Sequence, residues 1–194
     1  MLQKMLPVEL LVAAYAGGYF PMAGEDGEIR WYSPDPRGVL PLDGFHVPAR
    51  LARTRRSGRF DVRVDTRFRA VVEACAQDRD EGSWINGEIV ESYTELHRKG
   101  FAHSVEAWQA GRLVGGLYGV SLGGAFFGES MFHTVTDASK VALCALVERL
   151  QARSYRLLDV QWATLHLARF GAIEVSRRRY LQLLKQALAI DCTF

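Results

Sequence analysis

Three predicted strands follow one another with connections of only two or three residues, which constrains the fold more than any other feature of the sequence. Polar and apolar residues alternate over His103–Trp108, and the turn Gln109–Gly111 leads into a second strand, Leu113–Ser121. The pair Gly123–Gly124 then leads into a third strand, Ala125–Met131. Connections this short join antiparallel neighbours, so the sequence predicts an antiparallel meander within a sheet.

Helices and further strands are predicted on both sides of this meander. In chain order they are a strand at Phe60–Val64, helices at Arg67–Gln77, Glu88–Lys99 and Ala138–Arg153, a strand at Leu157–Gln161, a short helix at Leu165–Phe170, a strand at Ile173–Ser176 and a helix at Arg178–Ala189. Apolar residues recur at helical spacing, and Thr66 and Asp137 are suitable N-caps. The order predicts an α+β fold, with a mixed α/β sheet that is antiparallel in the middle and has βαβ crossovers later.

Residues 1–36 form a small N-terminal lobe in this prediction, and residues 37–194 form the main domain. The lobe has short elements separated by Gly and Pro, with aromatic side chains to pack. No apolar run approaches the roughly 20 residues that span a bilayer, so we expect no membrane association. Pro7 and Glu9 interrupt the N-terminal apolar run, which argues against a secretion signal. We therefore expect a cytoplasmic protein whose three cysteines stay reduced.

A single carboxylate lies inside an apolar, strand-like run. Glu129 is surrounded by Phe126, Phe127, Met131 and Phe132. Burying a carboxylate without a partner is costly, and a surface strand would not need so much apolar bulk around one acid. The pattern therefore fits an apolar pocket with one charge at its rim, suited to an apolar ligand that carries a cationic or amine group. It fits equally well an edge strand whose Glu faces water.

A second acid closes a later predicted strand. Asp159 and Gln161 are placed on one face by the two-residue period of a strand, with Val160 on the other. Ligands of open α/β sheets bind near the carboxyl ends of strands, so these polar residues are candidates for a site. By itself, this pattern favours a strand end that meets water. The lone acid at Glu129 makes a shared site more attractive.

Arginines are concentrated near the start of the predicted main domain, in residues 50–69. Only Asp61 and Asp65 balance a basic segment that contains Arg50, Arg53, Arg55, Arg56, Arg59, Arg63, Arg67 and Arg69. The net charge of the chain is only +2, so any nucleic-acid surface must be local. Arginine suits bidentate phosphate contacts. A charge run is usually a solvated basic face, but the near-absence of balancing acids here favours a nucleic-acid surface. Trp84 and Trp31 are either platforms for base stacking or part of the core.

Other kinds of site are not predicted. The five histidines (46, 97, 103, 133 and 166) have no metal-ligand spacing, so we expect no metal. The glycines between 115 and 124 belong to a hairpin and not to a phosphate-binding loop. Ser130 lies in a Gly-Glu-Ser sequence, not in the nucleophile elbow of a serine hydrolase.

With these residues identified, the chain resembles the bacterial leucyl/phenylalanyl-tRNA–protein transferases. The matching segments run in order along nearly the whole chain, and they are Tyr19–Pro21, Tyr32–Arg37, Asp78–Ile85, His103–Glu106, Leu113–Gly119, Gly128–Phe132, Ala138–Lys140 and Asp159–Gln161. The resemblance implies a small N-terminal domain followed by a GNAT-like acyltransferase domain. The combination of Gly-Glu-Ser-Met-Phe, Ala-Ser-Lys and Asp-Val-Gln is highly specific.

The resemblance also implies an activity and a set of roles. Leu or Phe, with Met as a further donor, would move from aminoacyl-tRNA to the α-amine of proteins that begin with Arg or Lys, which marks them for N-degron degradation. The donor side chain would occupy a pocket of Leu117, Phe126, Met131, Leu143 and Leu158, with Trp84 stacked on the terminal adenosine. The tRNA would bind Arg50, Arg53, Arg55, Arg56 and Arg59. Glu129 and Asp159 would match the acceptor's charge, and Gln161, held by Asp159, would orient the amine. We expect a monomer that needs no cofactor.

Some features separate this chain from its family and from rival interpretations. Met22 follows Phe-Pro where family members often have Trp, which would weaken one adenine platform. An acyl-CoA-dependent GNAT enzyme would need a glycine-containing pyrophosphate loop, and residues 131–137 contain no glycine. A non-enzymatic RNA-binding module would explain the arginines but not Glu129, Asp159 and Gln161. Transfer of an aminoacyl group from tRNA to a different acceptor stays open.

Overall fold

The computed structural model describes residues 5–77 and 83–194, so residues 78–82 of the matching segment Asp78–Ile85 lie outside the described residues. The helices are α1 (Val8–Ala16), α2 (Ala49–Arg56), α3 (Phe68–Gln77), α4 (Gly87–Arg98), α5 (Ala138–Ala152), α6 (Leu165–Ala168) and α7 (Arg177–Leu188). The strands are β1 (Phe20–Ala23), β2 (Ile29–Tyr32), β3 (Arg37–Val39), β4 (Asp61–Val64), β5 (Ala102–Gln109), β6 (Arg112–Leu122), β7 (Ala125–His133), β8 (Leu157–Gln161) and β9 (Ile173–Val175).

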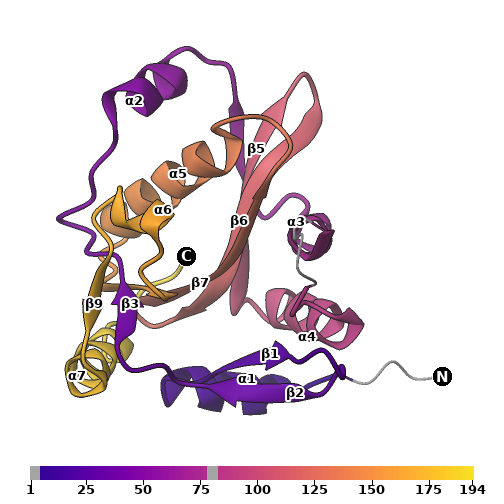
Figure 1. Cartoon of the computed structure of the whole chain (residues 1–194), viewed down its shortest axis with the longest axis vertical. Coiled ribbons are helices and arrows are strands. Elements are labelled where there is room, and N and C mark those ends of the chain that lie inside the picture. Colours follow the sequence, from indigo (N-terminus) through magenta and orange to yellow (C-terminus); the bar gives the residue numbers. More distant parts are fainter. Residues whose placement is uncertain (1–4, 78–82) are drawn as a thin grey trace.

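A large mixed sheet with the strand order β4-β5-β6-β7-β8-β3-β9 organises the molecule (Figure 1). Strands β5, β6 and β7 pair antiparallel, as the short connections predict, so the predicted meander is confirmed. Strand β4 extends it by pairing antiparallel with β5. Its turns use left-handed backbone at Ala110, Gly111 and Gly123. Strand β8 pairs parallel to β7, which confirms a βαβ crossover through α5.

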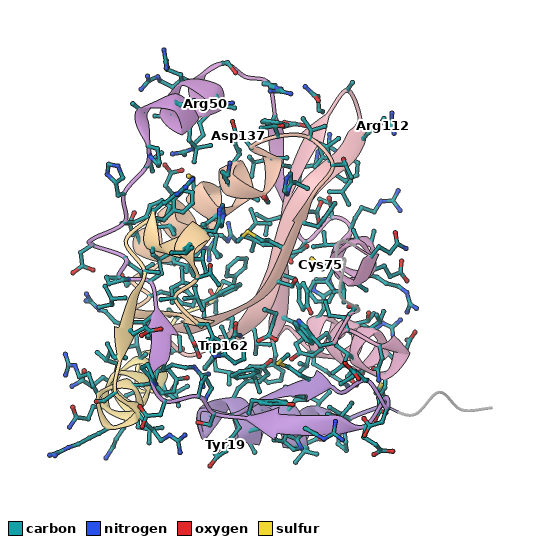
Figure 2. The ribbon with its side chains drawn as sticks, in the orientation of Figure 1. Tyr19, Arg50, Cys75, Arg112, Asp137 and Trp162 are labelled. Atoms are coloured by element: carbon teal, nitrogen blue, oxygen red, sulfur yellow. The ribbon has the colours of Figure 1, made fainter. Side chains whose placement is uncertain are left out.

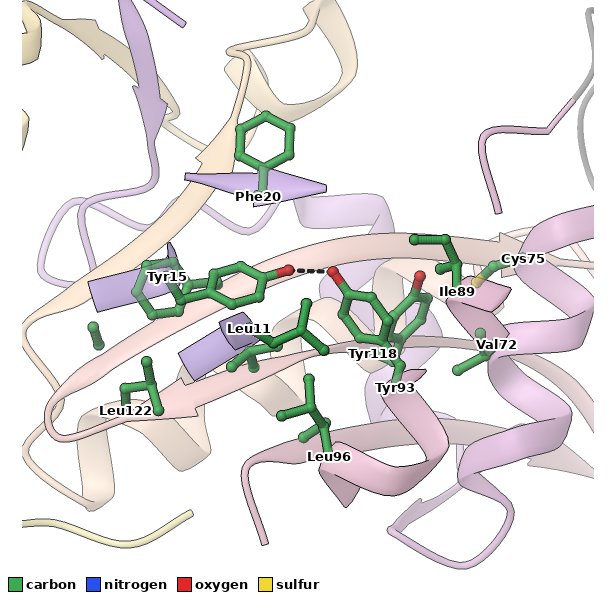
Figure 3. Packing of buried hydrophobic residues seen from close by; sticks show 14 of the residues in the cluster. Leu11, Tyr15, Phe20, Val72, Cys75, Ile89, Tyr93, Leu96, Tyr118 and Leu122 are labelled. Carbon is green, nitrogen blue, oxygen red and sulfur yellow. Dashed lines mark hydrogen bonds between the residues drawn. The ribbon is translucent and has the colours of Figure 1, made fainter. Parts of the chain in front are cut away.

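Helices cover both faces of the large sheet. Helix α5 packs against β5 and β6 on one face, while α3 and α4 lie on the other (Figure 1). The two larger apolar cores of the described residues lie one on each face. The N-terminal elements α1, β1 and β2 lie at one end, and their buried Leu11, Tyr15 and Phe20 belong to the core on the α3–α4 side (Figure 3). Within the described residues, no helix is long and apolar enough to cross a membrane.

In the predicted main domain, two of the described elements have no counterpart in the sequence-based prediction. Strand β3 lies between β8 and β9 and is antiparallel to both, so the crossover from β8 to β9 passes over an inserted strand. Its three residues are too few to show a periodic pattern, and its partners lie more than a hundred residues away. Helix α2 buries only Leu51 among its residues, so its sequence has no apolar stripe that would predict a helix. The division into residues 1–36 and 37–194 stays a prediction.

A β-bulge in β7 determines where the key carboxyl group points. Tyr118 pairs with Ser130 and Gly119 pairs with Gly128, so Glu129 is the additional residue on the bulged strand. A Cβ atom at Gly119 would lie 2.3 Å from the carbonyl oxygen of Phe127. The same Cβ would lie 2.4 Å from the Phe126 ring, so only glycine fits here. Bulges re-aim side chains next to functional sites, and this one brings Glu129 to the face where Tyr93 lies.

We expect Gly119→Ala to lower the free energy of unfolding by about 2–4 kcal/mol, because the new methyl group meets backbone and an immobile ring. Gly44→Ala is the control, since a Cβ there meets its nearest neighbour at an ordinary 3.6 Å. Urea denaturation measures both. Equal midpoints for the two variants would show that the bulge adapts without cost.

Candidate active site

A cavity of about 360 Å³ opens where β7 and β8 cease to pair. Phe127 and Asp159 form the last registered pair, and each strand continues beyond it without the other. Apolar side chains of β6, β7, α5 and β8 form much of the wall, namely Leu117, Met131, Leu143, Leu146, Leu158 and Val160. Phe20, Met22, Trp84 and Trp162 line the same cavity. Figure 2 shows Trp162 beside the N-terminal strands, and its ring meets that of Phe20 edge-on.

Most of the residues predicted to bind substrate lie in this wall. Leu117, Met131, Leu143, Leu158 and Trp84 line the cavity, and so does the divergent Met22. Trp31 does not line it; that ring lies in β2 and is partly exposed. The prediction that Phe126 binds substrate is corrected. Its side chain is fully buried in the core on the α5 side and is not part of the cavity lining. It packs behind the cavity and supports it.

Glu129 lies in the wall of the cavity and is largely buried. The alternative of an edge strand facing water is wrong, because β7 lies between β6 and β8. The Gln161 side chain donates from Nε2 to Oε1 of Glu129 at 3.2 Å, and the Tyr93 hydroxyl donates to Oε2 at 3.2 Å. Burial and the charge of Asp159 raise the pKa of Glu129 to about 8, against the hydrogen bonds from Tyr15 and Tyr93. Its carboxyl group therefore titrates close to neutral pH.

The two tyrosines behind Glu129 form a buried pair. The hydroxyl groups of Tyr15, from α1, and Tyr93, from α4, are hydrogen-bonded to each other (Figure 3). Burial, followed by the charge of Glu129, raises the pKa of both phenols well above the usual value. Both phenols therefore stay neutral and can donate hydrogen bonds toward the carboxyl group. Residues from three distant parts of the chain meet here.

Asp159 is completely buried and already paired. Arg37 donates from Nε and Nη2 to the two carboxylate oxygens at 2.9 and 2.6 Å, and the Tyr180 hydroxyl donates at 2.8 Å. Arg37 is 1% exposed, and its third donor reaches the carbonyl oxygen of Gly18 at 2.9 Å. The alternative that Asp159 lies at a strand end facing water is therefore wrong. The expectation that Asp159 matches acceptor charge also needs correction, because Arg37 already neutralises it.

Gln161 links the buried ion pair to the cavity. Its backbone N–H donates to Oδ1 of Asp159 at 2.9 Å, and its φ of 58° turns the chain at the end of β8. Its side chain lines the cavity and reaches Glu129. Asp159 thus fixes the backbone of Gln161, and the side chain stays available to the cavity. Arg37 and Tyr180 were missed as site residues, although Arg37 closes the matching segment Tyr32–Arg37.

The predicted RNA-binding arginines lie on or after α2, which packs on α5. Arg50, Arg53, Arg56 and Arg59 are exposed. Arg55 instead forms an ion pair with Glu148 at 2.6 Å. None of these arginines lines the cavity, and Figure 2 labels Arg50 at the end of the molecule where α2 lies. Their contact with RNA stays a prediction.

The fold also assembles a group that sequence spacing did not reveal. Asp65, His97 and His103 bring potential metal-ligand atoms within 4.8 Å of one another. Nδ1 of His97 lies 2.7 Å from the carbonyl oxygen of Ala102, and Nδ1 of His103 lies 2.7 Å from the Asp65 carboxylate. Hydrogen bonds to backbone carbonyl groups and between His103 and Asp65 thus already engage the two histidines. The expectation that the protein needs no metal stays a prediction.

We expect Asp159→Ala to lower the free energy of unfolding by about 3–5 kcal/mol, because it leaves the buried Arg37 guanidinium without a counter-charge. The double variant Arg37→Met/Asp159→Leu removes both charges and should recover part of that loss. Urea denaturation measures the two variants. If Asp159→Ala were as stable as wild type, water would have to reach the Arg37 guanidinium.

A pH-dependent stability is expected from Glu129. The folded-state pKa of about 8 lies above that of an unfolded Glu, so the folded protein keeps a proton that the unfolded chain loses. Wild-type stability should therefore fall as the pH rises toward 8. Because Gln cannot titrate, the stability of Glu129→Gln relative to wild type should grow by roughly 4 kcal/mol between pH 5 and pH 9. Exposed Glu25→Gln is the control, and a pH-independent difference for Glu129→Gln would refute the raised pKa.

Two comparisons with known sequences cover almost the entire chain. A family model described as "Leucyl/phenylalanyl-tRNA protein transferase" matches residues 39–185, and a model of the N-terminal domain of the same family matches residues 4–35. A relative from Herpetosiphon aurantiacus named "Leucyl/phenylalanyl-tRNA--protein transferase" is 56% identical over 98% of this chain and 99% of its own length. A relative of the same name from Gloeobacter violaceus is 54% identical over the full length of both chains.

Among solved structures, "The structure of L-PGS from Bacillus licheniformis" aligns with 94% of this chain and 71% of that one, at 10% identity and a TM-score of 0.48. This overlap is too low to assign a fold family, so the GNAT-like assignment stays a prediction, whereas the mixed sheet itself is established. By the matches of both family models and the identity to full-length relatives, the chain belongs to the leucyl/phenylalanyl-tRNA–protein transferase family and is an aminoacyltransferase.

Proposed function

We propose that this protein transfers Leu or Phe, and also Met, from aminoacyl-tRNA to the α-amine of proteins that begin with Arg or Lys. The reaction takes place in the cytoplasm, needs no cofactor, is carried out by a monomer and marks the acceptor for N-degron degradation. The observation that carries the proposal is the apolar cavity with one titratable carboxyl group, Glu129, bonded to Gln161 in its wall. The relatives' name states the donor and the protein acceptor.

The cavity suits an apolar aminoacyl group attached to a nucleoside. Leu117, Leu143 and Leu158 surround the space for the side chain, and burying a Leu or Phe side chain contributes about 1.5–3 kcal/mol. A volume of about 360 Å³ exceeds the needs of that side chain, so part of the terminal adenosine fits as well. Trp84 and Trp162 supply aromatic faces on which its base can stack.

The reaction is the aminolysis of an ester. The amine nitrogen attacks the ester carbonyl, a C–N bond forms, the C–O bond to the ribose breaks, and the ribose oxygen leaves with a proton. An ester is already activated, so holding the two reactants in attack geometry can supply on the order of 7–11 kcal/mol of the acceleration. The residues of the site therefore have two tasks, which are to orient the amine and to manage its protons.

Glu129 is suited to accept the proton of the acceptor's α-ammonium group. An α-ammonium has a pKa of about 8, close to the pKa of about 8 for Glu129, so proton transfer between them costs little. A cationic acceptor beside the carboxyl group also favours the carboxylate form, so binding of Arg or Lys helps to generate the base. Among the described residues, Glu129 is the one carboxyl group in the cavity wall.

Gln161 positions the amine. Its Nε2 donates to Glu129, which leaves Oε1 as an acceptor for an amine hydrogen. A neutral amide is a poor base, so orientation is the role that its chemistry allows. Asp159 and Arg37 act through the backbone of Gln161 and hold it in its left-handed conformation.

The test is transfer of radiolabelled Leu from Leu-tRNA to peptides that begin with Arg, Lys, Asp or Ala, without ATP. We expect label on the Arg and Lys peptides, and a kcat lowered about 10–100-fold in Gln161→Ala because orientation is lost. Gln182→Ala, an exposed change on α7, is the control. Asp159→Ala is a poor probe of chemistry, since it leaves Arg37 unpaired.

Other results would contradict parts of the proposal. Label on Asp peptides would keep the chemistry and reassign the acceptor. No label on any peptide, with Leu-tRNA still bound, would favour a different acceptor molecule. Acylation by an acyl-CoA without tRNA would overturn the donor, and an unchanged kcat in Gln161→Ala at saturating substrate would remove the positioning role.

A further inference from the structure

A second cavity, of about 300 Å³, adjoins the first one. It lies between the beginning of α2, the beginning of α5, and α6. His166 lines both cavities, so the imidazole forms a shared wall. The described walls of the first cavity contain no arginine or lysine, whereas Arg50, Lys140 and Arg169 all line the second. The two neighbouring cavities therefore have very different chemistry.

The second cavity has an excess of positive charge. Lys140 donates from Nζ to the Asp137 carboxylate at 2.9 Å, so these two charges offset each other. Within the described residues, no acidic side chain pairs with Arg50 or Arg169. Figure 2 shows Arg50 and Asp137 at the same end of the molecule, where α2 lies over α5. With His166 neutral, two guanidinium groups are left for an anion.

The environment of two neighbouring groups is consistent with this excess. The hydrogen bond from Lys140, followed by the charges of Arg50 and Arg59, lowers the pKa of Asp137. Burial, followed by the charges of Lys140 and Arg169, lowers the pKa of His166. An anion bound among these cations would offset their mutual repulsion.

We propose that the second cavity binds a backbone phosphate of the tRNA 3′ strand, on the 5′ side of the terminal adenosine. The inference rests on the proposed function, which places the aminoacyl ester in the apolar cavity. The RNA strand must leave that cavity, and the wall at His166 leads directly to the guanidinium groups of Arg50 and Arg169. Arginine forms bidentate, charge-assisted hydrogen bonds with phosphate.

This site would divide donor recognition between two cavities. The apolar cavity accepts the aminoacyl group and the base, while the second cavity fixes the strand that carries them. A phosphate held there positions the ester before the amine arrives, which is the kind of remote binding that aligns reacting groups. Arg53, Arg56 and Arg59 on and after α2 are exposed beyond it and extend the basic surface.

The test compares two donors that differ in phosphate content. One is the phenylalanyl ester of adenosine, and the other is the phenylalanyl ester of the trinucleotide CCA. The ratio of their kcat/KM values with an Arg peptide is the gain due to phosphate. We expect Arg169→Gln and Arg50→Gln each to lower this gain by about tenfold, the size of one charge-assisted contact. Arg112→Gln is the matched control, because Arg112 is exposed at the tip of the β5–β6 hairpin (Figure 2).

Two outcomes would overturn the inference. One is that Arg169→Gln and Arg50→Gln both keep the wild-type ratio of kcat/KM for the CCA ester to kcat/KM for the adenosine ester. The other is that Arg112→Gln lowers this ratio as much as they do, which would indicate a general electrostatic field and not a site. If the wild-type protein transfers from neither donor, the proposed function fails, and the same comparison is made with dissociation constants of unesterified CCA and adenosine. A tenfold loss of CCA affinity in Arg169→Gln would then still support the phosphate site.

Discussion

The buried ion pair between Arg37 and Asp159 is the interaction on which the rest of the site depends. It joins β3 to β8 across a sequence separation of 122 residues and leaves no part of either charge in water. Arg37 also binds the carbonyl oxygen of Gly18, so the N-terminal elements are tied to the same point. A buried pair of this kind contributes little net stability but is costly to break, which suits it to fixing geometry.

From this fixed point, the structure positions two groups at the cavity. Asp159 holds the backbone of Gln161, and the bulge beside Gly119 turns Glu129 toward Gln161 and Tyr93. Burial makes the carboxylate form of Glu129 costly and brings its pKa close to that of an amine. Burial of Glu129 therefore lowers the stability of the fold, but it provides a carboxyl group that can exchange a proton near neutral pH.

Short connections and periodic apolar residues in the sequence predicted part of the fold correctly. The meander of β5, β6 and β7 and the long helix α5 follow from short turns and an apolar stripe. The lone acid in an apolar run fitted a pocket and a water-facing edge strand equally well, and in the structure Glu129 lines a cavity. Strand β3 escaped prediction because three residues carry no period, and Arg37 escaped because its partner lies far along the chain. Phe126 was misplaced because its side chain packs into the core behind the cavity.

The sequence by itself determined the β5–β6–β7 meander, the family and the residue types of the site, because short-range patterns and motifs encode them. Only the tertiary structure decided which charges are free. It paired Asp159 with Arg37, left Glu129 as the acid in the described cavity wall and placed His166 between an apolar and a basic cavity. Charge compensation and burial depend on contacts between distant segments, so no local pattern encodes them.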